Sequence, residues 1–387
     1  MKAIPYGRQH ITQEDVDAVV STLTSDFLTQ GPKVAEFEQA FAAYTGAAYA
    51  VAISNGTAAL HLCAMALGVT EGTNVITTPI TFAASANCVR YCGGNVYFAD
   101  IDPETYLIDE KKVQQLIDSK PKGFFSGIIP VDFAGLPVNL EKLKAIAEKN
   151  GLWIIEDACH APGGSFTDSQ GREQKCGNGQ FAELAIFSFH PVKHIATGEG
   201  GMITTNSKEL YDKLILLRTH GITKNPALLQ ENHGPWYYEM QELGYNYRIP
   251  DMLCALGITQ LKRADEGLQK RRKIAEKYNA AFAGHPGIRI QDPALQAGHA
   301  FHLYIIKTAN RAGLYEALRQ NNIFAQVHYI PVHTMPYYRS LGFKKGDLPV
   351  AEAYYEECLS IPMFPTLTGE EQEFVIKTII NFVKDIK

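Results

Sequence analysis

The sequence contains no cysteine pattern of the kind that indicates disulfides or a metal site. Seven cysteines are spread along the 387 residues, an odd number with no CxxC pair, and isolated thiols usually pack in a protein core. His190 and His194 have the spacing of two metal ligands on a helix, but Pro191 between them argues against that helix. We therefore expect no metal, and a protein of a reducing compartment, the cytoplasm.

Long apolar runs and an excess of one charge are missing as well. No stretch comes near the roughly 20 apolar residues that span a membrane, and the chain turns polar soon after its start. The net charge of −5 gives no reason to expect nucleic acid or a membrane surface as a partner. The glycine fingerprint GxGxxG is also absent, which weighs against a dinucleotide oxidoreductase.

What the sequence does contain is a regular alternation of strand and helix patterns. Thr12 and Asp15 form a possible capping box for a first helix, and Pro32 fits the first turn of a second. Helical patterns then separate apolar runs, whereas residues 161–182 read as a loop. The expected strands are 48–53, 75–78, 96–101, one within 124–133, 152–156, 184–189 and 202–205. Such alternation predicts an α/β fold with a mostly parallel central sheet covered by helices on both faces.

The length of the chain predicts two domains, because single cores rarely grow beyond about 250–300 residues. A helical pattern of about 30 residues opens at Pro250 and continues to Tyr278, and we place the boundary at its start. The prediction is a large α/β domain with an N-terminal arm at residues 1–249. A smaller α+β domain follows at 250–387, with strands expected at 303–306 and 324–329 and helices near 314–318, 350–358 and 369–384.

Lys193 lies on a turn between two of the predicted strands. The first strand runs into Pro191, which cannot continue a central strand, and Gly198, Gly200 and Gly201 allow a tight return. A lysine held on such a turn is partly desolvated and has little rotamer freedom. Both effects favour a neutral amine, which can attack a carbonyl.

A carboxylate ends another predicted strand. The apolar run 152–155 leads into Glu156 and Asp157, which places Asp157 at the C-terminal end of a buried strand. Ligands of open α/β sheets bind at that end. A lysine that forms a Schiff base and an aspartate for a pyridinium nitrogen are the pair that pyridoxal phosphate requires.

Several other residues give weaker signals of a cofactor site. Gly56 and Thr57 open a helix after a strand, where backbone N–H groups can hold a phosphate, although a plain helix cap is the commoner reading. Phe82 near the start of a helix could stack on a flat heterocycle, or could belong to the core. Ser188 could donate to a phosphate and His160 could contact a ring hydroxyl, but each is a weak signal alone.

Three motifs together resemble the sugar aminotransferases of the DegT/DnrJ/EryC1/StrS family. They are SFHPVKHIATGEGG around Lys193, EDACH at 156–160 and GYNYR at 244–248, and the resemblance covers essentially the whole chain in the same order. It implies the fold-type-I aminotransferase fold, a homodimer and pyridoxal 5′-phosphate, with pyridoxamine phosphate as intermediate. It also implies the site residues: Lys193 for the Schiff base, Asp157 for the pyridine nitrogen, Phe82 for stacking, His160 beside the ring, Gly56, Thr57, Ala58 and Ser188 for the phosphate, and Asn246 from the other subunit.

A narrower resemblance points to the pseudaminic-acid branch of this family. It rests on IPYGRQ at 4–9, LTQG at 28–31 and VHYIPVH at 327–333. It implies amino transfer from L-glutamate to C4 of UDP-2-acetamido-2,6-dideoxy-β-L-arabino-hex-4-ulose. Asp132 stands where family members often have histidine, and we assign it no role. The residues implied beside the nucleotide sugar are Tyr6, Phe27, Leu28, Thr29, Gln30, His328 and Tyr329.

Two alternatives stay open. The chain could aminate another nucleotide-linked keto sugar, such as a dTDP sugar, because spacing does not reveal the shape of substrate loops. It could also be a non-catalytic binding protein or regulator on the same fold. The presence of both Lys193 and Asp157 weighs against the second alternative, and no basic stripe or DNA-binding helix pair supports it.

Overall fold

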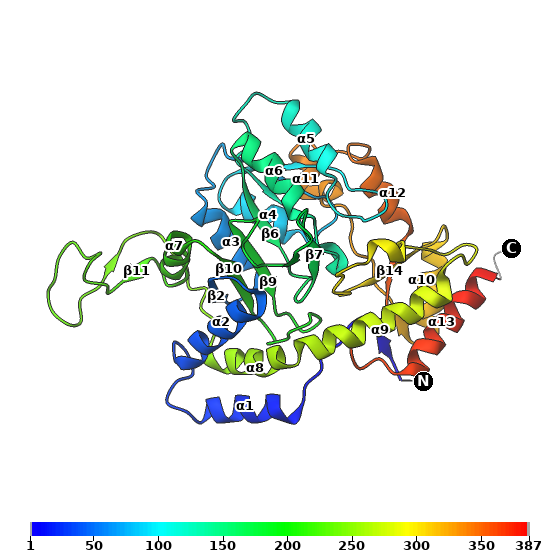
Figure 1. Ribbon diagram of the computed structural model, residues 1–387, viewed down its shortest axis with the longest axis horizontal. Helices are drawn as coiled ribbons and strands as arrows, with labels where there is room; N and C mark the ends of the chain where they lie inside the picture. Colours follow the sequence, from blue (N-terminus) through cyan, green and yellow to red (C-terminus); the bar gives the residue numbers. More distant parts are fainter. Residues whose placement is uncertain (1, 385–387) are drawn as a thin grey trace.

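A seven-stranded sheet forms the centre of the computed structural model, which describes residues 2–384 (Figure 1). Strand β10 is antiparallel to both of its neighbours, whereas the pairs from β9 to β4 are all parallel. The predicted mostly parallel sheet is therefore confirmed. In spatial order the strands are β2 (Tyr49–Ile53), β10 (Gly201–Thr205), β9 (Leu184–Ser188), β6 (Trp153–Asp157), β5 (Gly127–Ile129), β3 (Asn74–Thr77) and β4 (Asn95–Phe98).

Both faces of the sheet are buried. Alternate side chains of a strand point to opposite sides of the sheet, and in β2 the two sets belong to two different cores. Val51 and Ile53 of β2 belong to the larger core, which includes α3 (Gly56–Ala66), whereas Ala50 and Ala52 belong to a second core with α2 (Pro32–Thr45). The larger core also receives side chains from α4 (Ala84–Tyr91), α5 (Glu110–Asp118), α6 (Leu140–Asn150) and α7 (Lys208–Arg218).

The predicted helix starts near the N-terminus are confirmed. In α1 (Gln13–Leu23) the capping box forms, and the Thr12 N–H donates to Asp15 Oδ2 at 2.8 Å. Pro32 is the first residue of α2, where a missing N–H costs nothing. The α2 helix ends at Gly46 in the left-handed conformation.

The long helix predicted after Pro250 is instead two helices. They are α8 (Asp251–Lys262) and α9 (Ala264–Phe282), separated at Arg263, which has φ −107°. The guanidinium of Arg263 pairs with Asp15, so the break lies where the chain is tied to α1. Helix α8 packs on α1 and α2 of the first part, whereas α9 continues toward the C-terminal part (Figure 1). The domain boundary at residue 250 stays a prediction.

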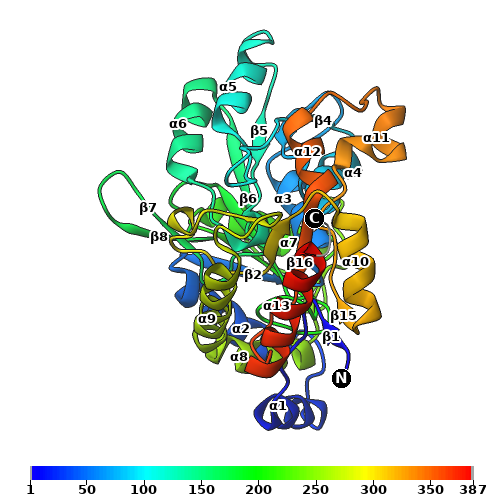
Figure 2. The same cartoon turned by 90° about the vertical axis from the view of Figure 1, so that its right-hand side faces the viewer.

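The C-terminal part has its own core around a three-stranded sheet (Figure 2). That sheet consists of β13 (Arg289–Ile290), β14 (Tyr304–Lys307) and β16 (Cys358–Ile361), with α10 (Arg311–Gln320) and α13 (Gly369–Lys384) packed beside it. The N-terminal arm reaches this part of the molecule, where β1 (Ile4–Pro5) pairs in parallel with β15 (Ile323–Phe324). The arm therefore contributes to the C-terminal core, to which Ile4 and Ile323 both belong.

Several expectations for irregular segments were wrong. The predicted loop 161–182 contains a hairpin of β7 (Ser165–Thr167) and β8 (Glu173–Lys175), and a second hairpin, β11 (Ile222–Thr223) and β12 (Glu239–Met240), projects from the body (Figure 1). The strand predicted at 324–329 is shorter: after β15, Gln326 makes only an isolated bridge to Ser360. The chain then continues as α11 (Pro336–Ser340) and α12 (Pro349–Glu357).

Two features bear on the expectations drawn from composition. The seven cysteines all lie within the described residues and are free thiols, five of them buried, as expected for isolated core cysteines. Between residues 2 and 384, no helix has both the length and the apolar character that crossing a bilayer would need.

Two helical glycines allow the packing of α8 to be tested. A Cβ at Gly257 would lie 2.5 Å from the ring of buried Phe37, so Gly257→Ala should lower the free energy of unfolding by about 1–3 kcal/mol through overpacking. Gly267 in α9 is the matched control, because its Cβ would meet only Pro365 at 3.7 Å. Gly267→Ala should raise stability by about 0.5–1 kcal/mol through helix propensity. Urea denaturation measures both, and a stabilising Gly257→Ala would contradict this packing.

Candidate active site

A cavity of about 910 Å³ lies at the C-terminal ends of β6 and β9. This is the edge where the sequence placed a ligand site. The cavity brings together side chains from the N-terminal arm, the start of α3, the lysine turn and the segment after β15. The predicted site residues in its lining are Tyr6, Gly56, Thr57, Ala58, Phe82, Asp157, Ser188, Lys193, His328 and Tyr329.

Lys193 lies on a turn that is fixed by backbone hydrogen bonds. Its own N–H donates to the His190 carbonyl at 2.8 Å, and the base of the turn is closed by bonds from Phe189 to Gly200 and from Thr197 to Phe189. Burial lowers the pKa of the Lys193 amine, while the nearby Cys159 and Asp157 act in the opposite direction. The net direction favours the neutral amine, as the sequence predicted.

Asp157 is buried at the end of β6 and fully engaged by donors. Its Oδ2 accepts from the Ser85 hydroxyl at 2.6 Å and its Oδ1 from the Cys159 N–H at 3.2 Å. Ser85 is in turn 2.7 Å from the Thr81 hydroxyl. These bonds fix the orientation of the carboxylate. The sequence gave no signal for Ser85, because its partner lies 72 positions along the chain.

The turn from β2 into α3 brings the first residues of that helix to the cavity. The Asn55 side chain accepts from the Ala58 N–H at 2.8 Å, so the predicted helix cap is present. A Cβ at Gly56 would lie 3.0 Å from Ser188 Cβ, a tight contact, so glycine lets this turn approach β9 closely. A Cβ at Gly201 would lie 2.8 Å from the Asn55 carbonyl, so a second glycine brings β10 against this turn. The first turn of a helix leaves N–H groups without intrahelical partners, and these attract an anion.

Amine, carboxylate and anion cradle border one cavity, so the residues present fit pyridoxal phosphate. Lys193 offers the amine for its aldehyde, Asp157 the carboxylate for its ring nitrogen, and the Gly56 turn with Ser188 the cradle for its phosphate. Phe82 is 63% exposed at the cavity, which rules out a place in the core and leaves its ring free to stack.

His160 lies behind the cavity lining rather than in it. Its Nε2 is 3.3 Å from the Tyr329 hydroxyl, and its Nδ1 accepts from the Ala134 N–H at 3.3 Å. Burial lowers the pKa of His160, so the ring is neutral and supports Tyr329. Its contact with a bound cofactor stays a prediction.

Five predicted residues lie away from this chain's own cavity. Phe27, Leu28, Thr29 and Gln30 form a loop that is held against α8, where the buried Asp251 bonds the Leu28 carbonyl and the Gly31 N–H. Asn246 is exposed and pairs with Thr219 in an isolated bridge. Their roles stay predictions, and that of Asn246 was predicted for the site of a second subunit.

The cavity also has an aromatic wall that the sequence did not reveal. It contains Tyr91, Tyr245 and Tyr247, with His61 Nδ1 at 3.1 Å from the Tyr247 hydroxyl. Tyr245 and Tyr247 flank Asn246 in the GYNYR motif. That motif was the one feature of the sequence that could have predicted this aromatic wall.

Asp132, which had no assigned role, belongs to a buried carboxyl pair on the far side of β6 from Asp157. Asp132, Glu156 and Cys176 are each at most 3% exposed. A carboxylate oxygen of each acid and the Cys176 Sγ lie within 4.8 Å of one another. Burial and the neighbouring carboxyl raise the pKa of Glu156 well above its usual range, and burial raises the pKa of Asp132 to about 7. Two carboxyls this close cannot both ionise cheaply, so the pair retains a proton at neutral pH.

Comparison with known proteins agrees with this geometry. A model of the DegT/DnrJ/EryC1/StrS aminotransferase family matches residues 9–380. The spore coat polysaccharide biosynthesis protein SpsC of Bacillus subtilis is 37% identical, over 98% of this chain and 97% of SpsC. The UDP-4-amino-4,6-dideoxy-N-acetyl-β-L-altrosamine transaminase of Campylobacter jejuni is also 37% identical, over 99% of this chain and 98% of that protein.

Solved structures give the same result. Helicobacter pylori PseC, an aminotransferase involved in the biosynthesis of pseudoaminic acid, superposes with a TM-score of 0.89 at 30% identity, over 99% of this chain and 100% of PseC. Streptococcus pneumoniae Spr1654 in its pyridoxal phosphate form superposes with a TM-score of 0.90 at 28% identity, over the whole of both chains. The predicted fold and cofactor are therefore confirmed.

The carboxyl pair predicts a pH dependence of stability. Because the Asp132 pKa rises from 3.8 to about 7 on folding, the folded chain keeps a proton that the unfolded chain releases between these values. Stability from this group is full at low pH and is lost as the pH rises from about 4 to about 7, with a slope of up to about 1.4 kcal/mol per pH unit. Asp132→Asn should flatten that slope in urea titrations across this window. The exposed Asp26→Asn is the control, and an unchanged slope in Asp132→Asn would contradict the assignment.

Proposed function

The chain belongs to the DegT/DnrJ/EryC1/StrS aminotransferase family, and on that premise we propose which amino transfer it carries out. The proposed donor is L-glutamate and the proposed acceptor is the C4 carbonyl of UDP-2-acetamido-2,6-dideoxy-β-L-arabino-hex-4-ulose. The product would be the amino sugar that enters pseudaminic acid biosynthesis. The activity class, a sugar aminotransferase that depends on pyridoxal phosphate, follows from the family and its relatives.

One observation carries the proposal: Lys193 and Asp157 share their cavity with Tyr6, His328 and Tyr329. The lysine and the carboxylate supply what the chemistry needs, and the other three form a wall of aromatic and imidazole groups on which a sugar can pack. The relatives named for a UDP-linked amino sugar and for pseudoaminic acid support the choice of acceptor.

The roles of the chain's own groups follow from their protonation. Bound pyridoxal phosphate supplies a ring that accepts the electron pair left when a proton leaves the carbon that carries the nitrogen. Lys193, whose pKa is lowered by burial, would be the base that takes this proton and returns it. The Asp157 carboxylate, held by Ser85 and the Cys159 N–H, holds a proton on the ring nitrogen. Phe82 and the Gly56 turn with Ser188 bind and orient the ring and the phosphate.

A second acceptor is favoured by a specific observation. SpsC, named for spore coat polysaccharide biosynthesis, has the same identity to this chain as the Campylobacter jejuni transaminase. Another nucleotide keto sugar, such as a dTDP sugar, is therefore the second candidate. A non-catalytic regulator is disfavoured because Lys193, Asp157 and the phosphate cradle are all in place. The cytoplasmic location proposed from the unpaired cysteines completes the assignment.

We further propose that the active form is a homodimer in which Asn246 reaches the phosphate of the other subunit's cofactor. Asn246 and the loop Phe27–Gln30 lie outside their own cavity, as such an arrangement requires. The hairpin β11–β12 and the residues that follow it expose Trp236, Met240 and Leu243 by 63–74%. Exposed apolar side chains clustered on one projection are typical of an interface.

The acceptor is tested with a panel of UDP- and dTDP-linked 4-keto sugars and glutamate, with products identified by mass spectrometry. The UDP-linked 4-keto-6-deoxy sugar should give a product heavier by the exchange of oxygen for an amine, and the dTDP sugars should react more slowly by about tenfold or more. Lys193→Ala is the matched control and should give no product, because the base is lost. Preferential reaction of a dTDP sugar would select the second candidate, and turnover by Lys193→Ala at the parental rate would contradict the role of that lysine.

Mixed dimers test the role of Asn246. Lys193→Ala and Asn246→Asp should each be inactive alone, the second because its carboxylate would repel the phosphate. Unfolded together and refolded, they should regain about a quarter of the parental activity, because half of randomly paired dimers are hybrids and each hybrid has one intact site. If Asn246 served its own chain, no hybrid site would be intact and activity would stay absent. An active Asn246→Asp protein would contradict the phosphate contact itself.

A further inference from the structure

Helix α12 holds both ends of the segment that carries His328 and Tyr329. The Tyr354 hydroxyl donates to the His328 carbonyl at 2.8 Å, and the Glu352 carboxylate lies 2.9 Å from Nε2 of His333. Tyr354 and His333 are buried. Hydrogen bonds in such surroundings are well shielded from competing water and keep their geometry.

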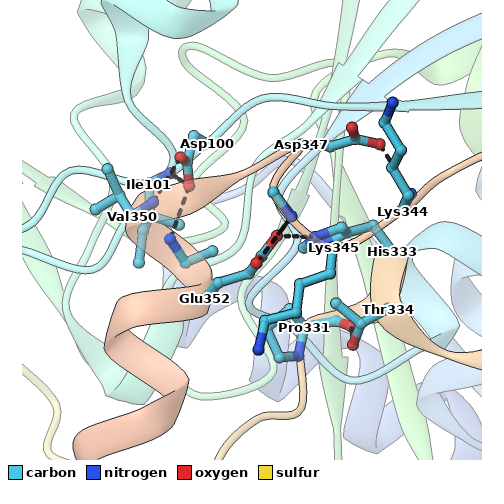
Figure 3. Close-up of polar contacts among 12 residues, drawn as sticks. Asp100, Ile101, Pro331, His333, Thr334, Lys344, Lys345, Asp347, Val350 and Glu352 are labelled. Atoms are coloured by element: carbon cyan, nitrogen blue, oxygen red, sulfur yellow. Dashed lines mark hydrogen bonds and ion pairs between the residues drawn. The ribbon is translucent and has the colours of Figure 1, made fainter.

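The helix is itself tied to the central sheet. Asp100, which follows β4, accepts from the N–H groups of Val350 and Ala351 at 2.9 Å each (Figure 3). A buried carboxylate at these positions caps the helix and complements the positive end of its dipole. The start of α12 is thereby fixed to the sheet that also carries Asp157.

Glu352 has a second contact that holds the following loop. The Gly346 N–H donates to both of its carboxylate oxygens, at 2.7 and 3.0 Å. Figure 3 shows Glu352 reaching from α12 to His333 and to the loop that carries Lys344 and Asp347. One side chain from the first turn of α12 therefore fixes the chain on both sides of α11.

The groups that hold the cofactor do not depend on α12. Asp157, Ser188 and Gly56 are placed by β6, β9 and the turn after β2. The wall of His328 and Tyr329, in contrast, has its backbone placed by α12, and its side chains bond to Ser360 and His160. A shift of about 1 Å in that wall would misplace an acceptor while leaving the cofactor end of the cavity intact.

We infer that Tyr354 and Glu352 are positioning residues for the keto-sugar acceptor and act through His328 and Tyr329. The inference rests on the proposed function, since it takes these two residues as the acceptor wall. It assigns no part to α12 in the reaction with the amino donor.

The test measures two half-reactions of the holoenzyme separately by stopped-flow absorbance: the reaction with glutamate and the reaction with the keto sugar. Tyr354→Phe, which removes only a hydroxyl, and Glu352→Ala should raise the concentration of keto sugar needed for half-maximal rate by about three- to tenfold. The rate with glutamate alone should stay within about twofold of the parent. Calorimetric titration with the UDP-linked amino-sugar product should show the same loss of affinity. Glu356→Ala, an exposed residue of the same helix, is the matched control and should match the parent in both halves.

Glu352→Gln can still accept from Gly346 and bond His333, and it should recover most of the affinity that Glu352→Ala loses. If the variants lose as much in the reaction with glutamate as in the reaction with the keto sugar, or lose nothing with the keto sugar, the inference is overturned while the proposed function stands. A parent protein that aminates none of the nucleotide keto sugars would instead overturn the proposed function, and the inference with it.

Discussion

The site depends on a carboxylate held inside the protein at the end of a strand. Asp157 is 5% exposed, and burying a charge is costly unless hydrogen bonds replace the lost water. Ser85 and the Cys159 N–H supply them. Because Asp157 is paired in register with Ile186 of the parallel strand β9, the same edge of the sheet leads directly into the turn of Lys193. Parallel pairing thus brings the acid and the amine to one cavity although they lie far apart in sequence.

Neighbouring residues of β6 have opposite surroundings. Asp157 faces hydroxyl and amide donors at the cavity, whereas Glu156 points to the other side and meets Asp132 and Cys176. On the second side, burial and the close carboxyl neighbour raise the pKa of Glu156 and favour its protonated form. The alternation of side chains along one strand is enough to separate a carboxylate for chemistry from one that stays neutral within the core.

The sequence predicted the residues whose signal is local. Lys193 and Asp157 stand where apolar runs end in proline, glycine or charge, and the strands that carry them were found for the same reason. Ser85, Glu352 and Tyr354 were missed because each acts on a partner that only the folded chain brings near. The break at Arg263 was missed because the apolar periodicity continues through it, from Leu261 to Leu268, and a single ion pair to Asp15 marks it. The predicted strand 324–329 is overestimated because its last residues, His328 and Tyr329, line the cavity instead of pairing in a sheet.

The pairing of β1 with β15 has a consequence for how the protein is made. Ile4 and Pro5 of β1 pair with Ile323 and Phe324, which the ribosome adds much later than β1. Tyr6 comes directly after them and faces the cavity. The pocket is therefore incomplete on every nascent chain that has not yet emerged past β15, and until then β1 has no partner strand.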